Sequence, residues 1–295
     1  MRKQFVQTTE ALLAADSRVV LLLGDIGVYA FRKAFAAHPE RVFNLGICEQ
    51  AMTSVAAGLA REGFLPIIHS IAPFVVERCF EQLKVDLCYQ QLGVRIVSVG
   101  ASYDYAALGC THHCPGDVSL LRSLPGMRIV TPGTPAEFDR LLRAVYADPL
   151  PAYIRLSERS NPAAHEVHFG RATVLRTGRA ATVLAVGPVL GGVLEAAQGL
   201  DVTVLYYTTL APFDGATLRE HCASRRLLVV EPFYTGTLAA DVANACGSLP
   251  MQVRWVGVPR EFRTGYGKPA EHDAACGLTA PQIRASLEEF LHAAA

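Results

Sequence analysis

The sequence predicts an α/β protein with two domains, each built on a mostly parallel sheet flanked by helices. Strand-like apolar runs alternate with helical patterns along the whole chain, as is typical of this class. The 295 residues correspond to two domains at roughly 150 residues each. The polar stretch 157–178 contains Pro162 and Gly170 and lacks periodicity. We therefore expect domains at 1–165 and 179–295, joined by a linker at 166–178.

The first domain is expected to begin its strands and helices at clear local signals. Its predicted strands are 19–23, 66–71, 94–99, 127–131 and 152–156, and its predicted helices are 49–61, 74–91, 117–124 and 135–147. In the first of these helices, Met52, Val55, Ala56 and Leu59 recur at helical spacing. Thr134-Pro135, followed by Glu137, predicts the start of the last one, because proline fits the first turn and an acid favours the positive end of the helix dipole.

The second domain repeats the alternation of strands and helices. Its predicted strands lie near 182–186, 202–206, 227–230 and 253–257, and its predicted helices near 189–198, 214–224, 237–245 and 280–293.

Composition narrows the function classes. Hydrophobic residues make up 51% and charged residues 18%, which excludes intrinsic disorder. The 27 Lys and Arg balance the 27 Asp and Glu, whereas a general nucleic-acid binder would carry a basic excess. The low share of charge also indicates that some surface is covered by a protein partner.

The sequence offers no targeting or membrane segment. Residues 4–10 are too polar for the apolar part of a signal peptide, and the uncharged stretch 180–194 is interrupted by glycine and proline. That stretch also falls short of the ~18 apolar residues that a spanning helix needs. The eight cysteines are scattered and several lie in apolar patterns, so we expect reduced thiols and a cytoplasmic location.

The run 44–60 contains the most informative candidate, Glu49, at the start of a helix whose next turns are small and apolar. The helix N-terminus favours the carboxylate, while apolar surroundings favour the neutral acid. Such a group could share a proton with a base, as general acid–base catalysis requires. The alternative is an ordinary exposed glutamate in a first helical turn.

The loop 108–116 is the second candidate, because it carries His112 and His113 between Cys110 and Cys114. Histidine donates hydrogen bonds and transfers protons near neutral pH. The four side chains are also suitable zinc ligands, but adjacent histidines rarely converge on one metal ion. We therefore expect no metal bound by this chain.

Other candidates are weaker when taken alone. Gly24-Asp25-Ile26-Gly27 follows a strand but lacks the remaining features of nucleotide-binding loops. Arg155 and Arg159, with Ser160, could contact a phosphate or form surface ion pairs. His69 and Phe74 lie at a strand-to-helix junction, where packing residues are common.

Taken together, these runs resemble the transketolase family over nearly the whole chain. The segments 44–59, 109–113 and 121–127 with Pro132 resemble its pyrimidine-binding domain. Residues 229–231, Gly236, 257–259 and Phe262 resemble the carboxy-terminal domain that follows. Deoxyxylulose-phosphate synthases and the beta subunits of 2-oxoacid dehydrogenases share this order of domains.

The resemblance implies thiamine diphosphate as cofactor and assigns roles to several residues. Glu49 would hydrogen-bond the pyrimidine ring and control its tautomer. His112 would face the reacting carbon and the donor hydroxyls, with His113 beside it as a further substrate contact. Asp25 would lie near the cofactor and the donor sugar. Arg155 or Arg159 would contact a phosphate, and the Arg-Leu-Ser-Glu-Arg spacing leaves the choice open.

Three departures from the family pattern qualify that assignment. The family usually places an aromatic ring against the aminopyrimidine, and here the corresponding stretch is 68–74, so His69 or Phe74 would take that place, or no ring does. In many full-length transketolases the loop before the Thr-His pair includes an acid and a further histidine, whereas residues 102–108 here read Ser-Tyr-Asp-Tyr-Ala-Ala-Leu, which puts the usual sugar-phosphate donor in doubt. The Gly-Asp-Gly motif that binds the diphosphate and its metal is missing from the sequence.

The missing motif predicts one chain of a split transketolase, assembled as an α2β2 complex. A separate subunit would hold the diphosphate and most of the ligands of Mg²⁺ or Ca²⁺, and the complex would transfer a two-carbon ketol unit between sugars or sugar phosphates. A beta subunit of a 2-oxoacid dehydrogenase, and a regulatory or scaffold relative without turnover, are the alternatives.

Overall fold

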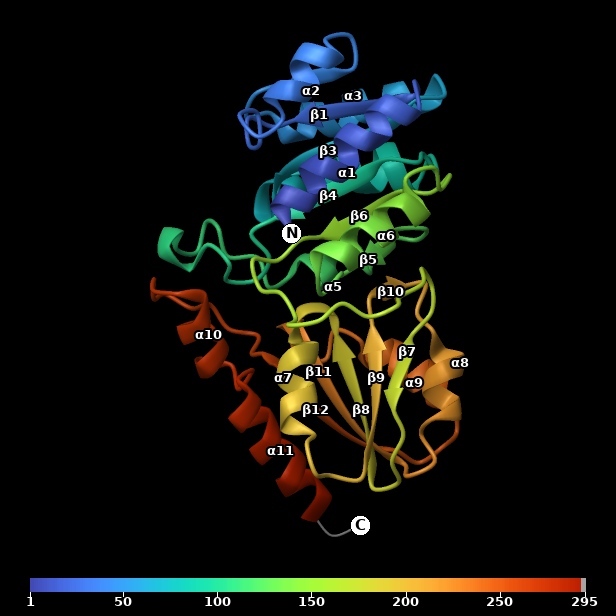
Figure 1. Cartoon of the computed structure of the whole chain (residues 1–295), viewed down its shortest axis with the longest axis vertical. Coiled ribbons are helices and arrows are strands. Elements are labelled where there is room, and N and C mark those ends of the chain that lie inside the picture. The colour runs from blue at the N-terminus through green and yellow to red at the C-terminus, as the bar shows by residue number, and fades with distance from the viewer. Residues whose placement is uncertain (293–295) are drawn as a thin grey trace.

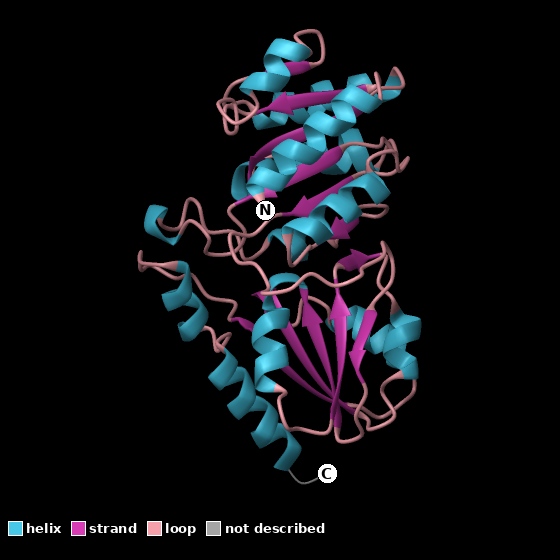
Figure 2. Cartoon of the chain, in the orientation of Figure 1, coloured by secondary structure: helices cyan, strands magenta, loops and turns pink. Residues whose placement is uncertain are grey.

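The computed structural model describes residues 1–292 and contains two sheets, one in each half of the chain (Figure 1). The predicted α/β class with two domains is confirmed. Figure 2 shows the strands as two separate groups with helices on the outside of each. Ala293, the last residue of the final predicted helix, lies outside the described residues, as do residues 294 and 295.

The first sheet has the strand order β10-β5-β6-β4-β3-β1-β2, and only β10 (Thr209–Ala211) is antiparallel to its neighbour. Its other strands are β1 (Val19–Leu23), β2 (Val42–Asn44), β3 (Leu65–Ile71), β4 (Arg95–Val99), β5 (Arg128–Val130) and β6 (Ala152–Arg155). Strands β1, β4 and β6 are buried over their whole length. This is the burial expected of parallel strands covered on both faces.

Helices cover both faces of this sheet. They are α1 (Arg2–Ala15), α2 (Arg32–Ala37), α3 (Glu49–Arg61), α5 (Asp117–Leu121) and α6 (Pro135–Val145). On one face α1 packs beside α6 (Figure 1), and the rings of Phe5 and Phe138 meet edge to face at 6.0 Å. The predicted start of α6 is confirmed by Thr134, whose hydroxyl accepts a hydrogen bond from the Glu137 N–H at 3.2 Å.

The opposite face is covered by α3 and by a helical segment that departs from the prediction. The helix expected at 74–91 consists of two π-helical stretches, Pro73–Glu77 and Leu83–Cys88, on either side of α4 (Phe80–Gln82). A π-helical turn contains an extra residue and so redirects the side chains that follow it. The apolar spacing of the sequence does not reveal this change.

The second sheet has the order β12-β11-β8-β9-β7, with β7 antiparallel at its edge. Its strands are β7 (Thr173–Arg176), β8 (Ala181–Val186), β9 (Val202–Tyr207), β11 (Arg226–Tyr234) and β12 (Gln252–Val258). Its helices are α7 (Leu190–Ala196), α8 (Gly215–Glu220), α9 (Ala239–Cys246), α10 (Pro269–Ala275) and α11 (Ala280–His292). The chain also has short 3₁₀ turns at Ala106–Leu108 and Gly187–Val189.

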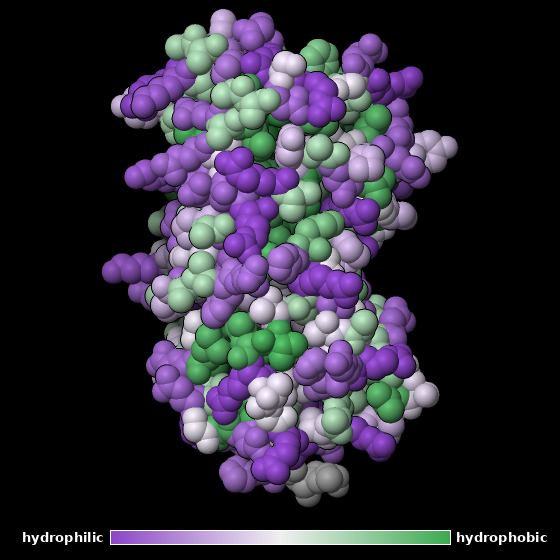
Figure 3. Space-filling view, turned by 45° about the vertical axis from the view of Figure 1, so that its right-hand side comes forward, coloured by the Kyte–Doolittle hydropathy of each residue, from purple (hydrophilic) through white to green (hydrophobic). Residues whose placement is uncertain are grey.

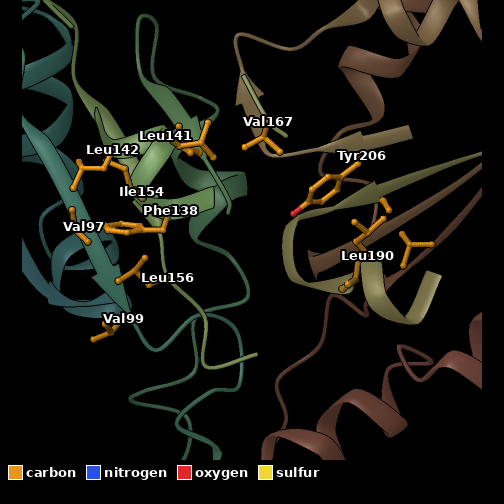
Figure 4. Packing of buried hydrophobic residues seen from close by; sticks show 14 of the residues in the cluster. Val97, Val99, Phe138, Leu141, Leu142, Ile154, Leu156, Val167, Leu190 and Tyr206 are labelled. Atoms are coloured by element: carbon orange, nitrogen blue, oxygen red, sulfur yellow. The ribbon is translucent and has the colours of Figure 1, made fainter. Parts of the chain in front are cut away.

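The two halves of the chain are joined by more than a connecting segment. Strand β10 (Thr209–Ala211) comes from the second half and extends the first sheet beside β5. Tyr206 points from β9 toward the first domain (Figure 4), and its hydroxyl donates to the buried Glu137 carboxylate at 2.7 Å. Because β7 lies inside the stretch expected as a linker, the division at 165 and 178 stays a prediction.

The surface mixes polar and apolar side chains. On the face in Figure 3, apolar side chains gather most densely on the upper part of the second domain. Within residues 1–292, no helix combines the length and the apolar character that crossing a membrane requires.

Candidate active site

The candidate residues of the first domain gather where parallel strands end. Asp25 follows β1, His69 and Ser70 lie near the end of β3, and Glu49 opens α3 shortly after β2. The loop with His112 follows the neighbouring strand β4. Ligand sites of open parallel sheets lie at the carboxyl ends of their strands, because the loops there converge.

Glu49 is a buried carboxylate held by two donors. The Ser70 hydroxyl donates to its Oε1 at 2.8 Å, and the Arg78 guanidinium donates to its Oε2 at 2.7 Å. The side chain of Glu49 is 1% exposed, so the interpretation as an ordinary surface glutamate does not fit. A buried carboxylate at a helix start, held in place by hydrogen bonds, can orient a ligand and exchange a proton with it.

Arg78 links the Glu49 carboxylate to Phe74, and Phe74 in turn contacts His112. The Arg78 guanidinium carbon lies 4.2 Å from the centre of the Phe74 ring, and the rings of Phe74 and His112 meet edge to face at 5.2 Å. The Thr111 hydroxyl is 3.0 Å from Nδ1 of His112, so Nε2 is the ring nitrogen left for a ligand. The structure thus brings Glu49, Phe74 and His112 together at one edge of the sheet.

His69 lies on the other face of the sheet. Side chains alternate along a strand, so Ser70 faces Glu49 whereas His69 faces α1, where its ring packs 4.7 Å from that of Phe5. Its Nδ1 donates to the Val97 carbonyl at 2.7 Å, and burial lowers the pKa of His69 to about 4, so the imidazole is neutral at pH 7. Gly27, at φ +92°, passes so close that a Cβ there would lie 3.2 Å from the ring.

Asp25 occupies a left-handed backbone conformation, at φ +66°, in the loop after β1. Asn44 holds this loop: its side-chain oxygen accepts from the Asp25 N–H at 2.9 Å and from the Gly46 N–H at 3.1 Å. The Asp25 side chain is exposed at the edge of the sheet, on the loop between Glu49 and His69.

His113 points away from His112 and into the junction between the domains. It is buried, its Nε2 lies 3.3 Å from the Ala106 carbonyl, and its ring contacts those of Tyr103 and His272. Burial lowers the pKa of His113. In the part of the chain that the structure describes, no group of three or more His, Cys, Asp or Glu could hold a metal ion.

The two candidate arginines already have carboxylate partners. Arg155 is buried, and its Nε donates to Asp117 at 2.7 Å while its Nη2 donates to the Ser102 hydroxyl at 2.7 Å. Arg159 forms an ion pair with Asp273 of α10. Both line a pocket at the domain junction rather than the edge with Glu49, and their role toward a phosphate stays a prediction.

A basic pocket that the sequence patterns did not reveal lies beside His69. It has a volume of about 360 Å³ and is bordered by His69 and Gly27, with Arg2 and Lys3 from α1 and Arg32 and Lys33 from α2. Glu10 is the acidic residue in its lining. The sequence signal that could have indicated this pocket is the pair of basic residues at the start of each helix, Arg2-Lys3 in α1 and Arg32-Lys33 in α2. Only the packing of α1 across the sheet brings them together.

Comparison with known families gives matches over nearly the whole chain. Residues 1–163 match the family model described as the transketolase pyrimidine binding domain, and residues 170–283 match the transketolase C-terminal domain.

Individual relatives agree with these matches. The chain is 40% identical to an uncharacterized 33.6 kDa protein in the fasciation locus of Rhodococcoides fascians, over 97% of this chain and 93% of that protein. It is 31% identical to one subunit of the apulose-4-phosphate transketolase of Phocaeicola vulgatus, over 98% and 97% of the two chains. A solved structure of a split gene transketolase, an inactive beta4 tetramer, superimposes with a TM-score of 0.87 at 29% identity, covering 98% of this chain and 97% of that one.

Proposed function

Because this chain belongs to the transketolase family, we propose that it is one subunit of a two-chain transketolase that transfers a two-carbon ketol unit between sugars or sugar phosphates. The observation that carries the proposal is the buried Glu49 carboxylate, hydrogen-bonded at the start of α3 beside Phe74 and His112. The three side chains place together the groups that the family chemistry needs: Glu49 exchanges a proton, Phe74 offers an aromatic face, and His112 supplies the histidine.

The residues of this chain fit the pyrimidine end of thiamine diphosphate. Glu49 would hold and exchange a proton at a ring nitrogen. Phe74 would lie against the ring, because it shares the Arg78 guanidinium with Glu49, whereas His69 packs on the other face of the sheet against Phe5. When bound, the cofactor supplies the electron sink for cleaving and forming carbon–carbon bonds. His112 would donate a hydrogen bond or a proton from Nε2 to a substrate oxygen.

The diphosphate end would belong to the partner chain. Among residues 1–292 no cluster of metal-ligating side chains exists, and Mg²⁺ or Ca²⁺ needs several oxygen ligands. The relative from Phocaeicola vulgatus is named as a subunit of its transketolase, which supports a separate second chain here as well. We assign the diphosphate and its metal ion to that second chain, in an α2β2 assembly.

The basic pocket beside His69 favours an anionic group on the substrate. Four basic side chains border it, and Glu10 offsets one of these charges. A phosphate at the far end of a sugar would bind there through charge-assisted hydrogen bonds. The cytoplasmic location is also part of the proposal, and it is supported by eight cysteines that are all free thiols.

The experiment that tests the proposal is reconstitution with a separate diphosphate-binding transketolase chain from the same organism. Calorimetry should detect no tight binding of thiamine diphosphate to this chain alone, and tight binding with turnover when both chains and Mg²⁺ are present. In the complex, Glu49→Gln should slow proton exchange at the thiazolium carbon by at least about 10²-fold.

The matched control for Glu49→Gln is Glu62→Gln, which changes an exposed glutamate at the other end of α3. This control should exchange at the wild-type rate. Micromolar binding and turnover by the single chain would disprove the two-chain proposal, and an unchanged exchange rate in Glu49→Gln would remove that residue from the mechanism.

A further inference from the structure

Arg78 makes both of the contacts that the proposed function reserves for the pyrimidine ring. Its guanidinium donates to Glu49 Oε2 at 2.7 Å and covers the face of Phe74, with 4.2 Å between the guanidinium carbon and the ring centre. A guanidinium is flat and cationic and carries its N–H donors at its edge. A protonated aminopyrimidine has the same three properties.

We infer that Arg78 is a displaceable occupant of the pyrimidine site, which closes the site in the free subunit and leaves when the aminopyrimidine binds. This inference rests on the proposed function, because it takes Glu49 and Phe74 as the groups that hold the ring. It concerns a residue to which the family resemblance assigns no role.

The position of Arg78 allows such a movement. Its side chain is 36% exposed, whereas its partner Glu49 is 1% exposed. The carboxylate is therefore fixed in the protein, also by Ser70, and the arginine reaches it from the solvent side. Arg78 directly follows the π-helical stretch Pro73–Glu77, which carries Phe74, so one short segment supplies both the aromatic face and its cover.

Leaving the site costs the guanidinium two favourable contacts, and binding of the pyrimidine must replace them. An ion pair with a buried carboxylate and a cation over an aromatic face both favour the closed arrangement. The arrangement also keeps the Glu49 carboxylate paired while no ligand is present. Arg78 thereby lowers the affinity of the free chain for the pyrimidine.

The test uses the full chain and the probe 4-amino-5-hydroxymethyl-2-methylpyrimidine, which needs neither a metal ion nor the partner chain. Arg78→Gln removes the cation and should bind the probe at least tenfold more tightly than the wild type in calorimetry. Arg78→Lys keeps the charge but loses the planar fork, and its affinity should fall between the two.

The chain offers a matched control in a second Arg-Glu-Phe arrangement. Arg254 pairs with Glu289 at 3.0 Å and lies 5.4 Å from the centre of the Phe290 ring, in the second domain. Arg254→Gln should leave the affinity for the probe unchanged.

A second measurement does not depend on any variant. In the chain with ¹⁵N-labelled arginine, the Phe74 ring current should shift the Arg78 guanidinium resonance, and saturating probe should return it to the value of a solvent-exposed arginine. If Arg78 instead serves only to support Glu49, its guanidinium resonance should stay shifted when the probe is bound.

The outcomes separate the inference from the proposed function. If the probe binds, Glu49→Ala abolishes binding, and Arg78→Gln binds equally or more weakly than wild type, the inference is wrong and the proposed site stands. If neither the wild type nor Arg78→Gln binds the probe, and the reconstituted complex binds thiamine diphosphate equally well with Glu49→Ala, the proposed pyrimidine site fails and the inference fails with it.

Discussion

His112 and His113 are neighbours in the sequence with different surroundings. His112 is partly exposed beside Phe74, while His113 is buried against Tyr103 and His272. A histidine that transfers a proton must reach its substrate, and burial lowers the pKa of His113 and removes it from the edge of the sheet. The two side chains therefore have separate tasks, with His112 as the candidate for catalysis and His113 as part of the domain junction.

Replacing His112 tests this division. In the reconstituted complex, His112→Ala should lower kcat by about 10²-fold or more, because it removes a positioned proton donor. Steady-state kinetics would measure this change, with His168→Ala as control, since the His168 side chain is 67% exposed in a segment away from the site. Normal turnover by His112→Ala would exclude it as a catalytic residue.

Strand β11 carries the carboxyl group of Glu231. Among the described contacts, no cationic side chain lies within hydrogen-bond distance of it. Glu231 is buried and accepts a hydrogen bond from the Gly236 N–H in the turn after the strand. Burial raises the pKa of Glu231 from 4.5 to about 8. At pH 7 this carboxyl group is mainly protonated in the folded chain, whereas it is ionised in the unfolded chain.

The contribution of Glu231 to the stability of the chain should consequently fall as the pH rises from about 4.5 to about 8. Over this interval the folded state holds one proton more than the unfolded state at Glu231, which corresponds to about 1.4 kcal/mol per pH unit. Glu231→Gln keeps an acceptor for Gly236 and removes this dependence, so it should become more stable than wild type toward pH 8.

Urea unfolding at several pH values measures the effect of Glu231→Gln. The control is Glu220→Gln, because Glu220 is exposed at the end of α8. Parallel pH profiles of wild type and Glu231→Gln would show that the raised pKa is absent.

For the molecule as a whole, one side of the first domain exposes large apolar side chains. Val55, Val85 and Tyr89 are 45%, 45% and 85% exposed, and Ile47, in the loop before α3, is 68% exposed. Val55 lies on α3, which is joined to the 83–88 segment by the hydrogen bond from Ser54 to Asp86 at 2.6 Å. The apolar face therefore adjoins the helix that begins with Glu49, and we propose that the diphosphate-binding chain covers it.

Charged substitutions on this face should weaken assembly. Val55→Glu and Tyr89→Glu would each bury an unpaired charge at the interface, and each should raise the dissociation constant of the two chains at least tenfold. Analytical ultracentrifugation measures this change, and Leu249→Glu is the control because Leu249 is 38% exposed in the second domain. Assembly at wild-type strength in both variants would contradict the proposed interface.

Local sequence signals determined the fold class, most strands of both sheets and the start of α6. Apolar runs and the Thr134-Pro135 pair act over a few residues, so their effect can be derived from the chain itself. The same signals indicated Glu49 and His112 as candidates. Short elements such as β2, β7 and β10 gave no such signal, because three or four residues are too few to establish a period.

Only the tertiary structure decided which candidates lie together. The alternation of side chains on β3 separates His69 from Ser70, and the π-helical turn after β3 brings Arg78 onto both Phe74 and Glu49. The basic pocket likewise needs α1 and α2, whose first residues are Arg2 and Arg32, to meet beside Gly27. Contacts between distant residues depend on the packing of whole elements, whereas each sequence signal describes one element alone.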